Sequence, residues 1–261
     1  MDAFPWSLPT PPWLLPALAL VAFLYATVGH AGASGYIAVL ALADAPAAAI
    51  KPLALLLNLV VASQGAWQFW RAGHLSWPRF RPLLLAGVGS AFLGGWLDLP
   101  ALWFQRLVAL VLLASALRFV QQPHDPASFH TPAPRSLVVA GAGLGLLAGL
   151  SGTGGGVFLT PLLLLRGWAS TRQAAAVSSL FILANSASGL AGLLFARRTS
   201  AGATGLMLPS GVVLMGLVVL AAGAVGARLG SRHWPVSWIR RCLALVLALA
   251  AWKLLGLQPP R

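Results

Sequence analysis

The chain has 261 residues, of which 59% are hydrophobic and 8% are charged, whereas a soluble domain carries about 25% charged residues. This composition excludes a soluble globular protein. The recurring apolar runs of about 17–25 residues are too long for barrel strands, so we predict an all-α polytopic membrane protein. The net charge of +13 comes from cations that flank the apolar runs, which favours contacts with anionic lipid and argues against nucleic-acid binding.

The first apolar run, residues 14–42, is too long to be one straight spanning helix. It would extend for ~45 Å, whereas the hydrocarbon core of a bilayer is ~30 Å thick. Dense glycines also interrupt a helix and allow other segments to approach its backbone. We therefore predict a broken or re-entrant helix, split by a cluster of three glycines, a histidine and a serine. The cluster consists of Gly29, His30, Gly32, Ser34 and Gly35.

Three further spans are predicted in the first half, over residues 52–70, 82–97 and 101–120. The first of these spans carries Asn58 in the middle of a face of small residues. Lys51 lies seven residues earlier, on the same helical face.

A polar segment rich in proline and histidine, residues 121–135, is interpreted as a linker. It separates a first transmembrane repeat, residues 1–120, from a second, residues 136–261. The second repeat opens on another glycine-rich apolar run, residues 136–165. At the centre of that run lie Ser151, Gly152, Thr153, Gly154, Gly155 and Gly156. The spans predicted after it cover residues 173–196, 205–227 and 239–257.

The two halves resemble each other in sequence. Identical residues recur in the two halves, and the offset between matching positions increases only from one predicted element to the next. It is 121 positions for Gly35 and Gly156, 127 for Asn58 and Asn185, and 135 for Trp103 and Trp238. We therefore predict two homologous halves, each a broken glycine-rich helix followed by three transmembrane helices. Two such breaks, one in each half, are typical of a transporter whose site lies between the repeats, so we expect them to meet near the bilayer midplane.

The number of lysines and arginines on the inner side of the membrane differs between two possible topologies. If each broken run crosses the membrane once, the halves are parallel and the inner side carries nine of the 17 lysines and arginines. If each run returns to its own side, the halves are inverted and the inner side carries 11 of them. The positive-inside rule favours inverted repeats, with the 71–81 and 228–241 loops inside and Arg197 and Arg198 outside.

No catalytic pattern stands out in the sequence. The spans contain no Ser/His/Asp order, no zinc-ligand spacing and no acidic pair, and the glycines of 152–156 lack the lysine of a phosphate-binding loop. We therefore expect no enzyme activity, no metal and no cofactor. An enzyme or assembly factor would need intramembrane acids or a histidine cluster.

The glycine breaks suit the coordination of an anion. Broken helices present backbone N–H groups and positive dipole ends, and Ser34, Ser151 and Thr153 add hydroxyl donors. Asn58 and Asn185 occupy equivalent positions after the two breaks. Their amides either bind substrate or form interhelical hydrogen bonds.

Other candidate residues also allow two interpretations. Lys51 either balances the anion or extends its ammonium group to the membrane surface. His30 is either a hydrogen-bonded structural residue or a proton carrier. The alternative for the glycines is that they serve only close helix packing.

Two motifs carry a family resemblance. The segment LSGTGGGVFLTPLL at 150–163, and AAAVSSLF at 174–181 followed by Asn185, resemble the TauE/SafE sulfite and organosulfonate exporter family. The resemblance implies transport of sulfite, thiosulfate or organosulfonates across a bacterial inner membrane. It also implies that Ser178 belongs to the substrate site.

The function that we expect is therefore secondary transport of a small sulfur-containing oxyanion, most simply export, by alternating access around the two breaks. An anion or small-solute channel, or a carrier of another small anion, is the alternative. Because the four acids lie near span ends or in polar segments, any proton coupling is expected to run through His30 or through protonation of the substrate. The expected partners are the anion and membrane lipid, and the sequence leaves monomer and homodimer open.

Overall fold

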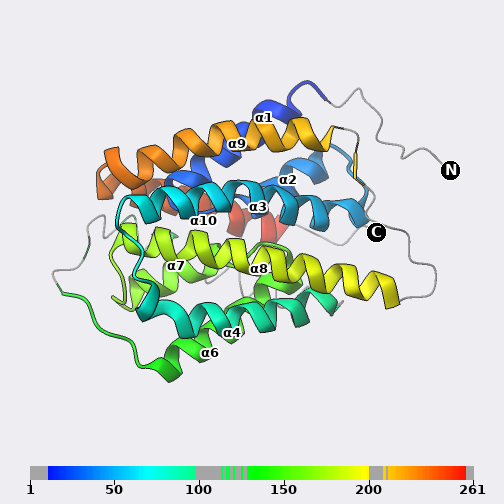
Figure 1. Ribbon diagram of the computed structural model, residues 1–261. Helices are drawn as coiled ribbons and strands as arrows, with labels where there is room; N and C mark the ends of the chain where they lie inside the picture. Colours follow the sequence, from blue (N-terminus) through cyan, green and yellow to red (C-terminus); the bar gives the residue numbers. More distant parts are fainter. Residues whose placement is uncertain are drawn as a thin grey trace.

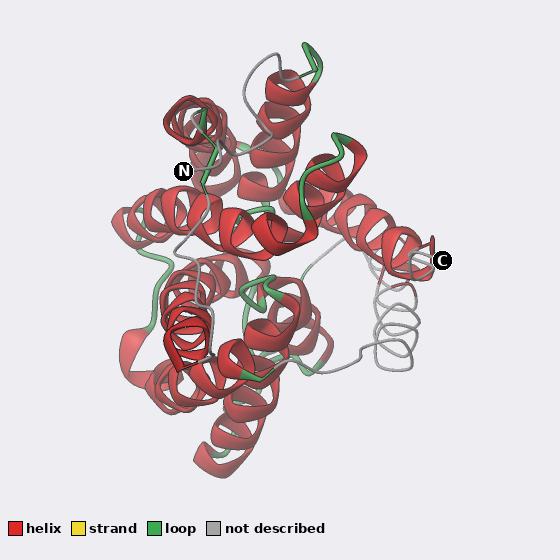
Figure 2. Ribbon diagram, turned by 90° about the vertical axis from the view of Figure 1, so that its right-hand side faces the viewer, coloured by secondary structure: helices red, strands yellow, loops and turns green. Residues whose placement is uncertain are grey.

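The computed structural model describes residues 11–97, 113, 116–117, 120, 125, 128–199, 208–209 and 211–256. Within these ranges every regular element is a helix, and the long helices pack side by side in one bundle (Figure 1). The view turned by 90° shows the described part built of helices and loops (Figure 2). Four of the helices are long and apolar enough to cross a membrane. The predicted all-helical, multi-pass class is therefore confirmed.

The described part of the first half includes four helices whose bounds are defined. They are α1 (Leu14–Thr27), α2 (Ala33–Leu42), α3 (Ala47–Arg71) and α4 (Trp77–Trp96). Helices α1 and α2 form a hairpin, since the Tyr25 hydroxyl lies 2.8 Å from the Ser34 hydroxyl across the turn. The span predicted over 101–120 falls almost wholly outside the described residues, as does much of the linker.

The second half follows the same order. Its elements are α6 (Pro134–Ser151), α7 (Gly156–Leu165), α8 (Thr171–Thr199), α9 (Val212–Arg228), the π-helical turn η1 (Leu229–His233) and α10 (Val236–Gly256). Helix α8 begins with a capping box, in which the Ser170 N–H donates to Gln173 Oε1 and the Gln173 N–H donates to Ser170 Oγ. This capping box fixes the start of α8 at Thr171, directly after the α6–α7 hairpin.

Two helices begin earlier than predicted. The predicted spans begin at Pro52 and Pro82, whereas α3 begins at Ala47 and α4 at Trp77. A proline in the second turn removes one backbone hydrogen bond, which tertiary packing tolerates near a helix end. Proline alone therefore does not locate these helix starts.

Helices α3 and α8 lie at the centre of the bundle and run antiparallel. Asn58 of α3 lies opposite Ser186 of α8, whereas Gly65, further along α3, lies opposite Ser179, earlier in α8. Around this pair, α4 packs against α6 and α8, and α9 packs against α1 and α3. Each half thus supplies a helix that covers the hairpin of the other half.

Glycines allow these helices to touch through their backbones. A Cβ added at Gly145 of α6 would collide with the carbonyl oxygen of Gly87 in α4. In the same way, a Cβ at Gly226 of α9 would collide with the carbonyl oxygen of Phe23 in α1. Small residues at the contact are the usual means of close helix packing in lipid, where apolar burial gives little driving force.

At one end of the bundle, at the left in Figure 1, α3, α7 and α9 end and α4, α6, α8 and α10 begin, and most of the described cations lie in or beside these helix ends. The loops there are tied together, since His74 Nε2 lies 3.0 Å from the Ser231 carbonyl oxygen and Arg79 donates to the His130 carbonyl oxygen at 2.6 Å. The cations at this end are Arg71, Arg79, Arg81, Arg135, Arg166, Arg172, Arg228, Arg232, Arg240 and Arg241. We call it the cationic end.

Candidate functional site

Each hairpin turns through a short irregular segment. The first break comprises residues 28–32, and the second break comprises residues 152–155. Both depend on left-handed backbone, with φ of 76° at Gly29 and 72° at Gly154, which side chains with a Cβ rarely adopt. Because α2 begins at Ala33, Ser34 and Gly35 lie in its first turn and not in the irregular segment. Gly156 likewise opens α7.

The first break packs against the second half of the chain. The Ser179 hydroxyl of α8 donates to the carbonyl oxygen of Gly29 at 2.9 Å, and no Cβ fits at Gly29 because the backbone of Ala175 fills that space. His30 Nε2 lies 2.8 Å from the Thr160 hydroxyl, which lies 2.7 Å from the Ser178 hydroxyl. A histidine from the first break therefore joins a hydroxyl pair from α7 and α8.

The second break packs mainly against α3 and α8. Asn58 Nδ2 donates to the carbonyl oxygen of Thr153 at 3.3 Å and to the Ser186 hydroxyl at 3.2 Å. The carbon chain of Lys51 lies against Gly152, where an added Cβ would be 2.8 Å from Lys51 Cγ. Helix α3 of the first half thus contacts the second break through the Asn58 amide and the Lys51 side chain.

The first break lies close to the start of α7, which directly follows the second break. A Cβ added at Gly156 would lie 3.2 Å from Cδ2 of the His30 ring and closer still to Ile182. Ile182 also packs against Gly154, so this one side chain of α8 contacts both the second break and the start of α7. The hydroxyls of Ser151 and Thr153, 2.8 Å apart, complete the polar lining of the second break.

Three of the predicted site residues hold buried polar atoms that have no hydrogen-bond partner among the described residues. They are Nδ1 of His30, Oδ1 of Asn58 and both amide atoms of Asn185. Buried polar atoms without a hydrogen-bond partner are rare in proteins, and they are candidate positions for a bound ligand or water. Asn185 faces Gly87 of α4, and it shares a face of α8 with Phe181 and Ile182, which contact residues 154–156.

Comparison with known proteins matches residues 14–254 to the model of the sulfite exporter TauE/SafE family. The chain belongs to this family. It is also 36% identical over 244 residues to a probable membrane transporter protein, y4hK, of Sinorhizobium fredii (strain NBRC 101917 / NGR234), covering 92% of this chain and 96% of that protein. No solved structure matches the chain. It is therefore a multi-pass membrane transporter of the TauE/SafE family, as the motifs predicted.

Two of the predicted site residues in this TauE/SafE transporter, Ser34 and Gly35, make contacts within their own hairpin. Ser34 bonds to Tyr25 within the α1–α2 hairpin, and Gly35 makes room for Val21, 2.5 Å from where its Cβ would be. These residues hold the hairpin together.

Two further polar residues of the candidate site, Thr160 and Ser186, were not predicted from the sequence. Thr160 falls inside the 150–163 motif, and Ser186 directly follows Asn185. Both signals were therefore present in the sequence, but neither residue is unusual by itself.

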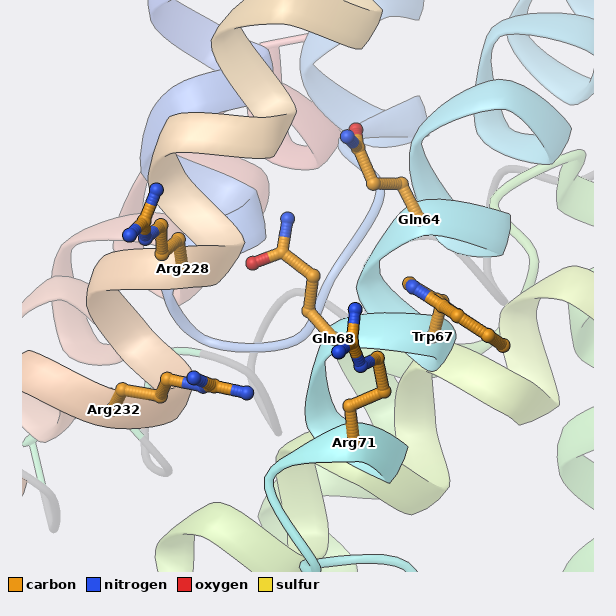
Figure 3. Close-up of a pocket in the computed structure, with 6 residues that line it drawn as sticks. All are labelled: Gln64, Trp67, Gln68, Arg71, Arg228 and Arg232. Atoms are coloured by element: carbon orange, nitrogen blue, oxygen red, sulfur yellow. The ribbon is translucent and has the colours of Figure 1, made fainter.

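The TauE/SafE transporter has a second polar feature, a cavity that the sequence pattern does not indicate. A cavity of about 400 Å³ lies at the cationic end, between α3 and the segment formed by α9 and η1. Figure 3 shows the Gln68 and Arg232 side chains pointing from opposite sides into the space between these elements. The lining residues are Gln64, Trp67, Gln68, Arg71, Arg228 and Arg232. We call this cavity the arginine pocket.

Proposed function

We propose that this transporter exports small sulfur-containing oxyanions, such as sulfite, thiosulfate or organosulfonates, by alternating access around the two breaks. The observation that carries the proposal is the set of buried polar atoms without partners at His30, Asn58 and Asn185. These residues come from both halves of the chain, and two of them contact the breaks. The family name, sulfite exporter, supports the class of substrate and the direction.

The chemistry around the breaks fits such an anion. A sulfonate or sulfite offers three acceptor oxygens, and burying it requires several donors because an unpaired ion in a low dielectric is very costly. The donors that we assign are the amide N–H groups of Asn185, which have no partner among the described residues, the hydroxyl of Thr153 and backbone N–H groups of the breaks. Asn58 positions the second break through its hydrogen bond to Thr153. Lys51, whose carbon chain lies on Gly152, supplies positive charge on the same side.

We further propose that the repeats are inverted in the membrane. Helices α3 and α8 are equivalent in sequence order and run antiparallel, and Figure 1 shows the same relation between α4 and α9. Each hairpin also returns toward the end of the bundle from which it starts. This arrangement supports alternating access by movement of one half against the other around a central site.

The cationic end is expected to face the cytoplasm, following the positive-inside rule. In a variant with Cys242 replaced by serine, a cysteine at position 76 should be protected from a membrane-impermeant maleimide added to intact cells. A cysteine at position 200 should be labelled. Labelling at 76, or a failure to label at 200 when permeabilised cells label fully, would contradict the proposed orientation.

Replacing the two asparagines by leucine is expected to weaken substrate binding. For Asn185→Leu, loss of a donor to a charged group lowers affinity about 10- to 150-fold. Asn58→Leu weakens binding because it removes the hydrogen bond that holds Thr153 of the second break. For Asn185→Leu we expect no loss of stability without substrate, because both amide atoms are buried without partners and an apolar group removes that penalty. Binding is measured by thermal shift across a panel of sulfite, thiosulfate, sulfonates, sulfate and carboxylates.

The matched control is Ser63→Ala, on the exposed side of α3, where the hydroxyl bonds only to the Val60 carbonyl oxygen of its own helix. This variant should bind like the unmodified protein. If Asn58→Leu and Asn185→Leu both fold and keep unchanged affinity for every anion in the panel, the proposed site is wrong. Saturable counterflow in proteoliposomes then tests whether transport follows a carrier mechanism, which a channel would not show.

A further inference from the structure

The arginine pocket lies at the level where two membrane spans end. The apolar spans Ala49–Arg71 and Val212–His233 both end at this cavity, one on each side of it. On α3, the rings of Trp67 and Trp70 are 5.3 Å apart and both are more than half exposed. Exposed tryptophans at span ends are typical of the membrane–water interface. The pocket therefore opens at the level of the lipid headgroups.

The positive charge in the pocket has no protein counter-charge among the described residues. No ion pair there involves Arg71, Arg228 or Arg232, and Arg71 lies over the Trp67 ring at 5.6 Å from the ring centroid. Of the described acids, Asp125 pairs with Arg240, and Asp44 lies between α2 and α3, whereas the pocket lies at the other end of α3. Three guanidinium groups around one cavity favour an anion with several acceptor oxygens.

The surface of α9 that leads to the pocket is apolar. Leu217 and Val225 are more than half exposed and lie on the same helical face as Arg228 and Arg232. This stripe runs from the middle of the span to the arginines. An anion that carries a hydrocarbon tail would fill both features, whereas a free anion would use only the pocket.

We propose that the arginine pocket binds the phosphate headgroup of an anionic phospholipid, with its acyl chain along the Leu217–Val225 stripe of α9. The guanidinium groups of Arg228 and Arg232 bind the phosphate oxygens, and Trp67 with Arg71 closes the α3 side. Because α3 belongs to the first half and α9 to the second, the bound lipid bridges the two halves. The site is separate from the substrate site between the breaks.

The test is native mass spectrometry of the purified transporter titrated with phosphatidylglycerol or with phosphatidylcholine. The unmodified protein should retain phosphatidylglycerol in preference to phosphatidylcholine. Each arginine near a membrane surface changes affinity for anionic lipid about fivefold, so Arg228→Gln/Arg232→Gln should lower phosphatidylglycerol affinity about 25-fold. Both side chains are exposed, so the double variant should keep its thermal stability in detergent.

The matched control is Arg81→Gln/Arg135→Gln, which removes two exposed arginines from the same end of the bundle but outside the pocket. It should retain phosphatidylglycerol like the unmodified protein. Equal losses in both double variants would overturn the proposal, because binding would then reflect diffuse charge. The proposal also fails if, in lipid-free detergent, inorganic phosphate or sulfite stabilises the unmodified protein through Arg228 and Arg232 while phosphatidylglycerol does not.

Discussion

Replacement of Asp125 by asparagine is expected to lower the free energy of unfolding by about 3–5 kcal/mol, because it leaves a buried guanidinium group without its counter-charge. The Asp125 carboxylate lies 2.8 Å from Arg240, whose side chain is 4% exposed. It also accepts hydrogen bonds from the backbone N–H and the hydroxyl of Thr171, the first residue of α8. One carboxylate thus joins the starts of α8 and α10.

The measurement is equilibrium unfolding in mixed detergent micelles, followed by circular dichroism. Asp44→Asn is the matched control, since Asp44 is exposed and has φ of 54°, a conformation that asparagine tolerates equally well. It should change stability by less than about 0.5 kcal/mol. The double variant Asp125→Leu/Arg240→Met should recover most of the loss. A single Asp125→Asn variant as stable as Asp44→Asn would show that the pair does not stabilise the fold.

Replacement of Gly154 by valine is expected to abolish transport. The φ of 72° is unfavourable for any residue with a Cβ, and the new Cβ would lie 2.8 Å from Ile182 Cγ2 and 2.9 Å from Asn58 Nδ2. Strain and overpacking together amount to about 2–5 kcal/mol. Because the added methyl groups displace the Asn58 amide, we expect substrate affinity to fall further than the 10- to 150-fold loss of one donor.

Gly143→Val provides the control for the same change in the same hairpin. Gly143 is exposed on α6, and an added Cβ there would meet no atom within 4 Å. Transport by this variant in proteoliposomes should match that of the unmodified protein. If Gly154→Val reaches the membrane, folds and transports at a normal rate, the second break does not form part of the transport site.

The sequence by itself determined the class of this protein. A chain with 59% hydrophobic and 8% charged residues belongs in a membrane, and its long apolar runs form spanning helices. The reason is that every backbone N–H and C=O group in lipid must form its hydrogen bond within the protein. The motif at 150–163 correctly indicated the TauE/SafE family. Dense glycines also marked the segments where the helices α1 and α6 end, since few other residues adopt left-handed backbone.

Only the tertiary structure decided which half each break contacts. The His30 side chain is within hydrogen-bond distance of the Thr160 hydroxyl in the other half, and the Asn58 amide donates to the Thr153 carbonyl oxygen. Both contacts cross between the halves, which pack together through the antiparallel helices α3 and α8. Helical periodicity shows which residues share a face. It does not show which neighbour that face meets, since lipid and protein interior are similarly apolar in a membrane.

The arginine pocket depends on the same tertiary information. Arg71 and Arg228 are 157 positions apart in the chain and each follows an apolar run, so the sequence alone favours topogenic charges for both. They line one cavity because α9 packs beside α3 and both helices end at the same level. Composition thus determined the all-helical membrane class, whereas the packing of one half on the other brings the residues of the candidate sites together.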